Sequence, residues 1–176
     1  MIGNSTIGGL LLSAIAVLHG STAQAEPAQA DPIAELKKLG ARIKLDEKGQ
    51  VIQVNLGERR VTDADMVYLQ GLEHLEELDL TRTRITSAGL ANLRDLKALK
   101  KLFLTETKVD ETGIDQLKGL KSLETLGLSG TKIRDAALKP VQEMKGLKYL
   151  YCIGTGVTDG GVASLQKALP DCFIAH

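Results

Sequence analysis

One segment of the sequence, LDLTRTRITSAGL, constrains the fold more than any other feature, because it returns at a fixed interval. It occupies residues 78–90 and returns as LFLTETKVDETGI at 102–114 and as LGLSGTKIRDAAL at 126–138, 24 residues further on each time. The apolar positions are kept, while the residues between them vary freely. A constant period of this length predicts a repeat architecture, in which each unit buries its apolar residues against its neighbours.

The apolar residues form columns when the chain is aligned at this 24-residue period. Three of the columns are Val51, Leu75, Leu99, Leu123 and Leu147; Val54, Leu78, Leu102, Leu126 and Leu150; and Leu56, Leu80, Leu104, Leu128 and Cys152. The L-x-x-L-x-L pattern ends in alternation, which predicts a strand with one buried face. Later in the unit, leucines three residues apart predict a short helix or 3₁₀ segment on the opposite side.

Polar and glycine columns predict how the helical side is held. We expect N-caps at Thr62, Thr86, Asp110 and Thr158. We expect glycines to let the helical segments approach the strand layer closely, at Gly89, Gly113 and Gly161.

The full pattern, L-x-x-L-x-L-x-x-T-x-I-T-x-x-G-L, resembles the leucine-rich repeat, in particular the type found in secreted bacterial proteins. The resemblance implies an α/β solenoid of about five repeats with terminal caps, with a parallel sheet on one face and short helices or 3₁₀ segments on the other. Many members of the family carry an asparagine whose side chain bonds the turn backbone. Here threonine hydroxyls are expected to do so, at Thr83, Thr107, Thr131 and Thr155.

The ends of such a solenoid expose core and need covering. Residues 33–50 are predicted to form an N-terminal cap, with a short helix after Asp31 that ends at Gly40 and two strands joined near Gly49. Residues 51–176 form the solenoid. Its last unit is aligned at 22 residues, with Cys172 and Ile174 in the second and third columns.

The first 25 residues lack charged side chains and contain an apolar run from Ile7 to Leu18, which is too short to span a bilayer. With Ala23-Gln24-Ala25 as a cleavage site, they predict a secretory signal peptide, followed by a linker at 26–32. The predicted location is therefore secreted or periplasmic, with no membrane-spanning segment in the mature chain. The alternative is a cytoplasmic protein, if this N-terminus does not act as a signal.

The composition argues against several classes of function. Lys and Arg number 22 and Asp and Glu number 22, so no overall positive charge attracts nucleic acid. Mature-chain histidines are limited to His74 and His176, and no nucleophile motif or phosphate-binding loop is present. We therefore predict no enzyme activity, no metal site and no cofactor.

The two cysteines, Cys152 and Cys172, are predicted to stay free and to pack in the core. In the predicted register they lie on adjacent strands, two residues apart, a diagonal of roughly 8 Å against a limit of about 7 Å for a disulfide. A slip in register at the last unit would overturn this prediction.

Charged residues also form columns. One is basic, Arg60, Arg84, Lys108 and Lys132, and one is acidic, Asp63, Glu111, Asp135 and Asp159. They form either a strip for a partner or pairs between neighbouring coils, and we favour the pairs, which contribute little when exposed.

Candidate binding residues lie between the buried leucines, on the open sheet. Aromatic side chains gather towards the C-terminal strands and charged ones towards the N-terminal strands, with Phe173 expected in the Phe103 column. Exposed aromatics on a rigid surface are typical of binding hot spots. The candidates are Phe103, Tyr149, Tyr151, Phe173 and Ile153 as anchors, and Lys101, Asp79 and Arg82 as a polar rim.

The sequence thus favours an extracytoplasmic interaction module that binds a protein, or an envelope glycan, on its open sheet. The alternative is a structural or self-associating envelope protein without a specific ligand.

Overall fold

The fold is a solenoid of short strands and helical segments, and the computed structural model describes residues 31–176. The predicted signal peptide and its cleavage site lie outside the described residues. The strands are β1 (Arg42–Leu45), β2 (Val51–Asn55), β3 (Glu77–Asp79), β4 (Lys101–Phe103), β5 (Thr125–Gly127), β6 (Tyr149–Tyr151) and β7 (Phe173–Ala175). The α-helices are α1 (Pro32–Lys38), α2 (Glu111–Gln116), α3 (Leu138–Val141) and α4 (Asp159–Ala168), and the 3₁₀ segments are η1 (Asp63–Leu69), η2 (Gly89–Leu93) and η3 (Asp135–Ala137).

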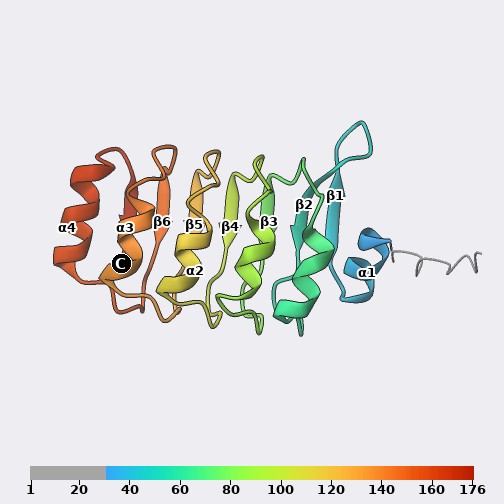
Figure 1. Ribbon diagram of the computed structural model, residues 1–176, viewed down its shortest axis with the longest axis horizontal. Coiled ribbons are helices and arrows are strands. Elements are labelled where there is room, and N and C mark those ends of the chain that lie inside the picture. Colours follow the sequence, from blue (N-terminus) through green and yellow to red (C-terminus); the bar gives the residue numbers. More distant parts are fainter. Residues whose placement is uncertain (1–30) are drawn as a thin grey trace, which may run out of the picture.

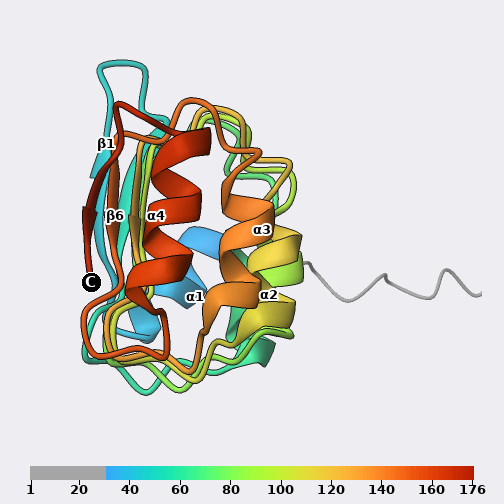
Figure 2. The same cartoon turned by 90° about the vertical axis from the view of Figure 1, so that its left-hand side faces the viewer.

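The strands form one sheet in chain order, β1 to β7. Figure 1 shows the coils stacked side by side, and Figure 2, seen along the stack, shows the sheet on one side and the helical segments on the other. From β2 to β7 the strands are parallel, and each residue pairs with the residue 24 positions later, as in Val54 with Leu78 and Leu78 with Leu102. One face of the sheet therefore packs against the helical layer and the other stays open.

The predicted apolar columns form the core. Leu78, Leu102 and Leu126 are fully buried under the sheet, and Leu90 and Leu93 close the core from the helical side. The first and last coils are looser, since Leu72 and Val157 are only partly buried. A single coil could not exclude water from these side chains, so burial depends on stacking.

The threonine column bonds the turn backbone as predicted. Thr83 donates its hydroxyl to the carbonyl of Leu80 at 2.7 Å, and the same bond recurs at Thr107, Thr131 and Thr155. The first three of these threonines are buried, 5% exposed, so each hydroxyl has its partner within its own coil. The repeat therefore places a polar side chain inside without leaving it unpaired.

The N-terminal helix and hairpin also match the prediction. Asp31 caps α1 by accepting the Ile33 N–H at 3.0 Å, and Gly40 ends the helical turn with a φ of 82°. The hairpin turns at Gly49, with a φ of 78°. Strand β1 then pairs antiparallel with β2 and becomes the first strand of the sheet.

The last unit corrects one prediction. Tyr149 pairs with Phe173 and Leu150 pairs with Ile174, so the 24-residue period holds to the end and the 22-residue alignment is wrong. Phe173 therefore joins the column of Lys101 and Tyr149 and not that of Phe103. The leucine spacing could not decide between the two registers, because a shift of two residues keeps the same side chains on the buried face. The ladder hydrogen bonds, including Phe173 N–H to the Lys148 carbonyl at 2.8 Å, belong to the 24-residue register.

The role predicted for the glycine column is also corrected. A Cβ on Gly113 would lie 2.7 Å from Ser87 Oγ and 3.0 Å from Ser87 Cα, which belong to the preceding coil and not to the strand layer. The same Ser87 hydroxyl donates to the Asp110 carboxylate at 2.6 Å. The glycine thus makes room for a hydrogen-bonded latch between consecutive coils.

The acidic column supplies equivalent latches in two other coils. Asp63 accepts the N–H and the hydroxyl of Thr86 at 2.7 and 2.6 Å, beside Gly89. Asp135 accepts the same two groups of Thr158, beside Gly161.

These contacts revise two predictions. Thr86 does not cap η2, whose N-cap is Ala88. Its hydroxyl donates to Asp63 and accepts the N–H of Ala88 itself, at 3.2 Å, one residue before η2 begins. The pairing of the basic and acidic columns is wrong, since the basic column (Arg60, Arg84, Lys108 and Lys132) makes no ion pair within residues 31–176.

Candidate interaction surface

The open face of the sheet presents two outward-facing residues from each parallel strand. In chain order the two columns are Gln53, Glu77, Lys101, Thr125, Tyr149 and Phe173, and Asn55, Asp79, Phe103, Gly127, Tyr151 and Ala175. The charged and amide members lie on β2 to β4, Thr125 lies on β5, and the aromatic members lie on β4, β6 and β7. The face therefore changes from charged to apolar along the solenoid, as the sequence predicted.

The aromatic end is a cluster of three rings. The Phe173 ring lies 6.4 Å, centroid to centroid, from both the Tyr149 and the Tyr151 ring, at interplanar angles of 55° and 60°. Tyr149 is 46% exposed and Phe173 is 56% exposed. The correction in register is what brings Phe173 beside the two tyrosines, because strand β7 now aligns it with Tyr149.

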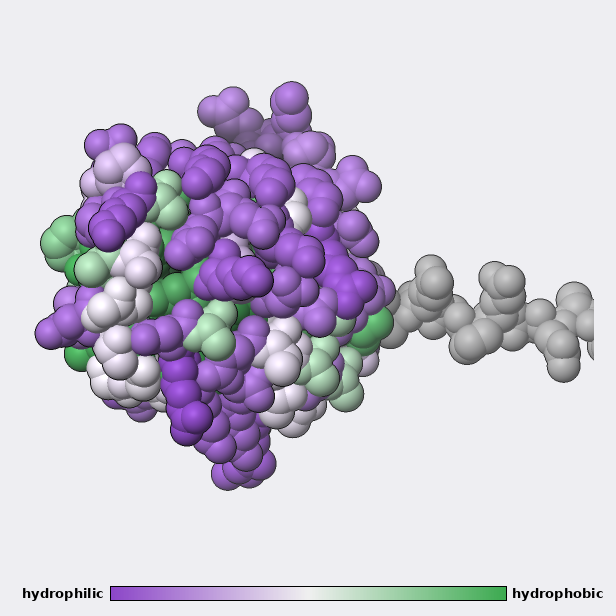
Figure 3. All heavy atoms as spheres, turned by 60° about the vertical axis from the view of Figure 1, so that its left-hand side comes forward, coloured by the Kyte–Doolittle hydropathy of each residue, from purple (hydrophilic) through white to green (hydrophobic). Residues whose placement is uncertain are grey.

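Two further candidates extend this cluster. Ile153, in the turn after β6, is 56% exposed. Phe103 is half-buried, and its ring lies against Gly127, where a Cβ would come within 3.1 Å of the ring. Gly127 therefore leaves space for the Phe103 ring on the face. The C-terminal end of the molecule, turned forward in Figure 3, shows hydrophobic residues gathered in the left half of the view and polar residues over most of the rest.

The middle of the face is polar and internally bonded. Asp79 accepts the Asn55 amide at 2.8 Å and the Thr81 N–H at 2.9 Å. Glu77 accepts the Gln53 amide at 2.9 Å and lies 3.4 Å from the Lys101 ammonium. Both carboxylates thus have hydrogen-bond partners within the face, and Glu77 also has a cation beside it.

Arg82, the remaining candidate, lies in the turn after β3 and is held by acids of both adjacent coils. Its guanidinium donates a bidentate pair of hydrogen bonds to the Glu106 carboxylate, at 2.9 and 3.0 Å, and a third hydrogen bond to Glu58 at 3.2 Å. The hydrogen bonds to Glu106 and then Glu58 raise the pKa of Arg82, and the bond to Arg82 lowers the pKa of Glu106. All three residues have a positive φ, and the next two coils place Gly130 and Gly154 at this left-handed position. The left-handed turn conformation explains these two glycines.

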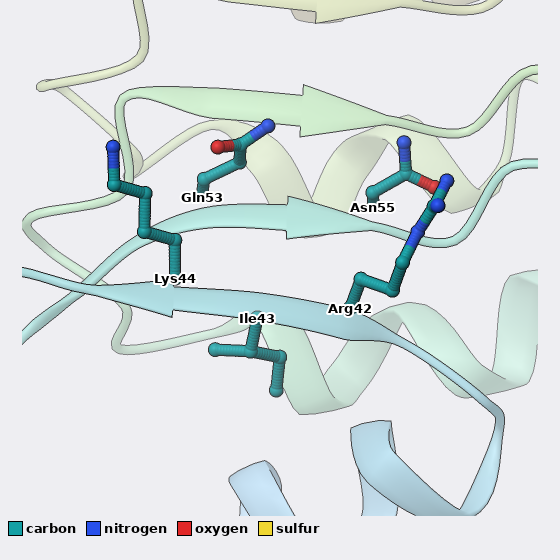
Figure 4. A pocket seen from close by; sticks show the side chains of 5 residues that line it. All are labelled: Arg42, Ile43, Lys44, Gln53 and Asn55. Atoms are coloured by element: carbon teal, nitrogen blue, oxygen red, sulfur yellow. The ribbon is translucent and has the colours of Figure 1, made fainter.

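The first strand adds two residues that the sequence reasoning missed. Arg42 pairs with Asn55 and Lys44 with Gln53 across β1 and β2. Figure 4 shows these four side chains on the same side of the strands, around a shallow hollow, while Ile43 points to the other side. The signal was the alternation of Arg42, Ile43, Lys44 and Leu45, which falls outside the repeat alignment.

The two cysteines are free and buried at the C-terminal end. Burial, with the neighbouring Cys172 as a smaller cause, raises the pKa of the Cys152 thiol to about 11. Burial also raises the pKa of Cys172. Both thiols therefore stay protonated at neutral pH and pack as small apolar groups.

The described residues hold neither a cluster of metal ligands nor a membrane-spanning helix. Between Asp31 and His176, no three His, Cys, Asp or Glu side chains come together as metal ligands would. Within the same stretch, no helix combines the length and the apolar character needed to cross a bilayer.

Comparison with known proteins shows which family of repeats the sequence matches and which solved structures share the fold. Residues 73–133 match the family model described as leucine rich repeat. These residues are leucine-rich repeats, and the solenoid has the leucine-rich repeat fold. A search of the curated proteins found no match for this leucine-rich repeat chain.

Two solved structures share the solenoid. The crystal structure of PEPR1-AtPEP1 is similar over 76% of this chain and 19% of that chain, with 20% identity and a TM-score of 0.51. A leucine-rich repeat protein of Leptospira interrogans is similar over 71% of this chain and 37% of that chain, with 18% identity and a TM-score of 0.50. This leucine-rich repeat chain thus spans about a fifth and about two fifths of their lengths. Leucine-rich repeat proteins generally mediate interactions between proteins.

Proposed function

We propose that this chain is an extracytoplasmic interaction module that binds a protein partner on the open face of its sheet. The apolar anchors are Phe103, Tyr149, Tyr151, Phe173 and Ile153, and the polar rim is Lys101, Asp79 and Arg82. The mechanism is rigid presentation: the stacked coils fix the backbone, so few side chains lose freedom on binding.

The observation that carries this proposal is the exposed aromatic cluster. Tyr149 and Phe173 remain about half exposed, whereas the buried apolar core of residues 31–176 contains only aliphatic residues, methionine and cysteine. Fully burying a side chain of this size stabilises a protein by about 1.5–3 kcal/mol, and the exposed part of each ring forgoes its share of that free energy. Large apolar groups clustered on a flat surface are therefore best explained by a partner that covers them.

The extracytoplasmic location rests on the sequence of the first 25 residues. N-terminal sequencing of the exported protein tests it, and the expected first residue is Glu26. An intact N-terminus in the cytosolic fraction would contradict this location without affecting the binding surface.

A self-associating structural protein is the other hypothesis, and the last strand of the sheet offers a route to it. The Gln166 side chain of α4 donates to the carbonyls of Leu169, Pro170 and Cys172, at 3.1, 2.9 and 3.0 Å. These bonds brace the turn before β7 (Phe173–Ala175) and do not block edge pairing by the strand itself.

Affinity capture from a cell-envelope extract, followed by mass spectrometry, tests the proposal. The bait is the wild-type chain, beside Tyr149→Ala/Tyr151→Ala and the control Val67→Ala. Val67 is 47% exposed on η1, on the opposite face, so it matches Tyr149 in exposure. We expect proteins that the wild type and Val67→Ala retain and the tyrosine variant loses. Equal retention by all three would refute the proposal.

A further inference from the structure

The charge on the open face is compensated unevenly, and this points to the chemistry of the partner. Arg42 and Lys44 are both exposed, and within residues 31–176 neither makes an ion pair. The acids of β3, two strands away, accept hydrogen bonds from the amides of Gln53 and Asn55, and Glu77 also lies 3.4 Å from the Lys101 ammonium. The first strand therefore contributes an uncompensated positive charge at one end of the face.

The opposite end is apolar and offers few polar partners. Gly127 and Ala175 lie beside Tyr151, Thr125 is the one polar neighbour of Tyr149 on β5, and Ile153 follows in the next turn. A glycan would need several hydrogen-bonding side chains beside the rings, because each hydroxyl that loses water without a partner costs free energy. The tilted, exposed rings instead offer apolar surface on which an aliphatic or aromatic side chain can pack.

We infer that the face takes an extended, acidic peptide segment of a protein partner. One apolar side chain of the segment lies in the cluster of Tyr149, Tyr151 and Phe173, and a carboxylate lies on Arg42 and Lys44. This inference rests on the proposed function, and it adds the chemistry of the bound segment and the direction in which it runs across the sheet. The segment runs perpendicular to the strands and passes over the hydrogen-bonded acids of β3.

The spacing of the two ends sets the length of the segment. Between β1 and the cluster on β6 and β7 lie five to six strand intervals, and at about 4.8 Å each this is roughly 26 Å. An extended chain advances about 3.3 Å per residue, so the apolar and acidic side chains should be about eight residues apart.

The test is selection of a display library of random 12-residue peptides on the full chain, followed by fluorescence anisotropy of the selected peptides. We expect peptides with an apolar residue about eight positions from Asp or Glu. Arg42→Glu/Lys44→Glu should weaken their binding at least about tenfold, as should Tyr149→Ala/Phe173→Ala. The control Lys139→Glu/Lys167→Glu makes the same change in net charge on the exposed helices α3 and α4, and it should leave binding unchanged.

The outcomes separate the inference from the proposed function. Peptides that need the aromatic residues but bind Arg42→Glu/Lys44→Glu as well as the wild type would overturn the inference and leave the proposed function in place. Peptides indifferent to both substitutions, or no selected peptide at all, would overturn both. Selective binding of neutral envelope glycans to the aromatic cluster would also overturn the inference. Circular dichroism of each variant checks that the fold is retained.

Discussion

The latch between coils makes a sharp prediction at Gly113. Replacing it with alanine places a Cβ at 2.7 Å from Ser87 Oγ and at 3.0 Å from Ser87 Cα, where the second contact involves backbone that cannot turn away. Gly113 is buried in α2, so solvent offers no relief. We therefore expect Gly113→Ala to destabilise the fold, although alanine favours a helix more than glycine does.

Gly160 is the matched control for this change. It also lies within a helix, α4, but its Cβ would meet only Thr158 Oγ1, at 3.6 Å, which is an ordinary contact. Both substitutions gain about 1 kcal/mol of helix propensity, so the comparison cancels that gain. What remains is the overpacking against Ser87, about 2 kcal/mol within a usual range of about 1–3 kcal/mol.

Thermal and urea unfolding measure this difference. A domain of this size changes its Tm by about 2–4 °C per kcal/mol, so Gly113→Ala should unfold about 6 °C below Gly160→Ala. The combination of Gly113→Ala with Ser87→Gly should recover part of the loss, because the two sites are in contact. Equal melting temperatures for the two alanine variants would refute the claim that Gly113 packs too closely against Ser87 to accept a Cβ.

Three further predictions concern the threonine column, the acid response and the thiols. Thr107→Val removes the buried hydroxyl that donates to the Leu104 carbonyl at 2.7 Å and should cost about 1 kcal/mol in urea unfolding, while an unchanged midpoint would contradict the role of that bond. Hydrogen bonds from Ser87, and then from Thr112, lower the pKa of Asp110 below its ordinary 3.8, so this stabilisation is present above that pH and is lost as the pH falls through the folded pKa. Stability measured from pH 6 to pH 2 should therefore fall less steeply in Ser87→Ala than in the wild type, and parallel curves would exclude this linkage. With the pKa of Cys152 at about 11, only about one thiol in a thousand is ionised at pH 8, so iodoacetamide should label the cysteines only after unfolding, and rapid labelling of the native chain would show that they are accessible.

The repeated residues made much of the fold predictable. Leu78, Leu102 and Leu126 recur at one period and alternate with polar residues, and only a stacked parallel sheet buries all of them. The hydroxyl of Thr83 could be placed because its slot is fixed by the buried residues on either side. The helix after Asp31 and the turn at Gly49 carry their own local signals.

The contacts between coils were not predictable in the same way. Gly113 was expected to favour close approach to the strands, but its actual neighbour, Ser87, depends on how adjacent coils are offset. Phe173 was misplaced because the leucine spacing shortens in the last unit, whereas backbone hydrogen bonds keep the register. The pattern of Phe173, Ile174 and Ala175 against Tyr149, Leu150 and Tyr151 was the signal that could have placed it.

On the candidate surface, too, residues inside the repeat were predictable and residues outside it were not. Tyr149 and Tyr151 were assigned to the open face correctly, because alternation along a strand fixes which side chains point outward. Arg42 and Lys44 were missed, since the strand that carries them precedes the first repeat and joins the sheet through an antiparallel hairpin.

The central claim is that a protein partner covers the aromatic end of the sheet, and the most direct measurement is the Kd of a captured partner for single variants. Tyr149→Ala should raise the Kd by about tenfold or more, which corresponds to about 1.4 kcal/mol. Val67→Ala, equally exposed on the helical side, should leave the Kd unchanged. A Kd that responds to Val67→Ala and not to Tyr149→Ala would place the partner on the wrong side of the solenoid and contradict the account.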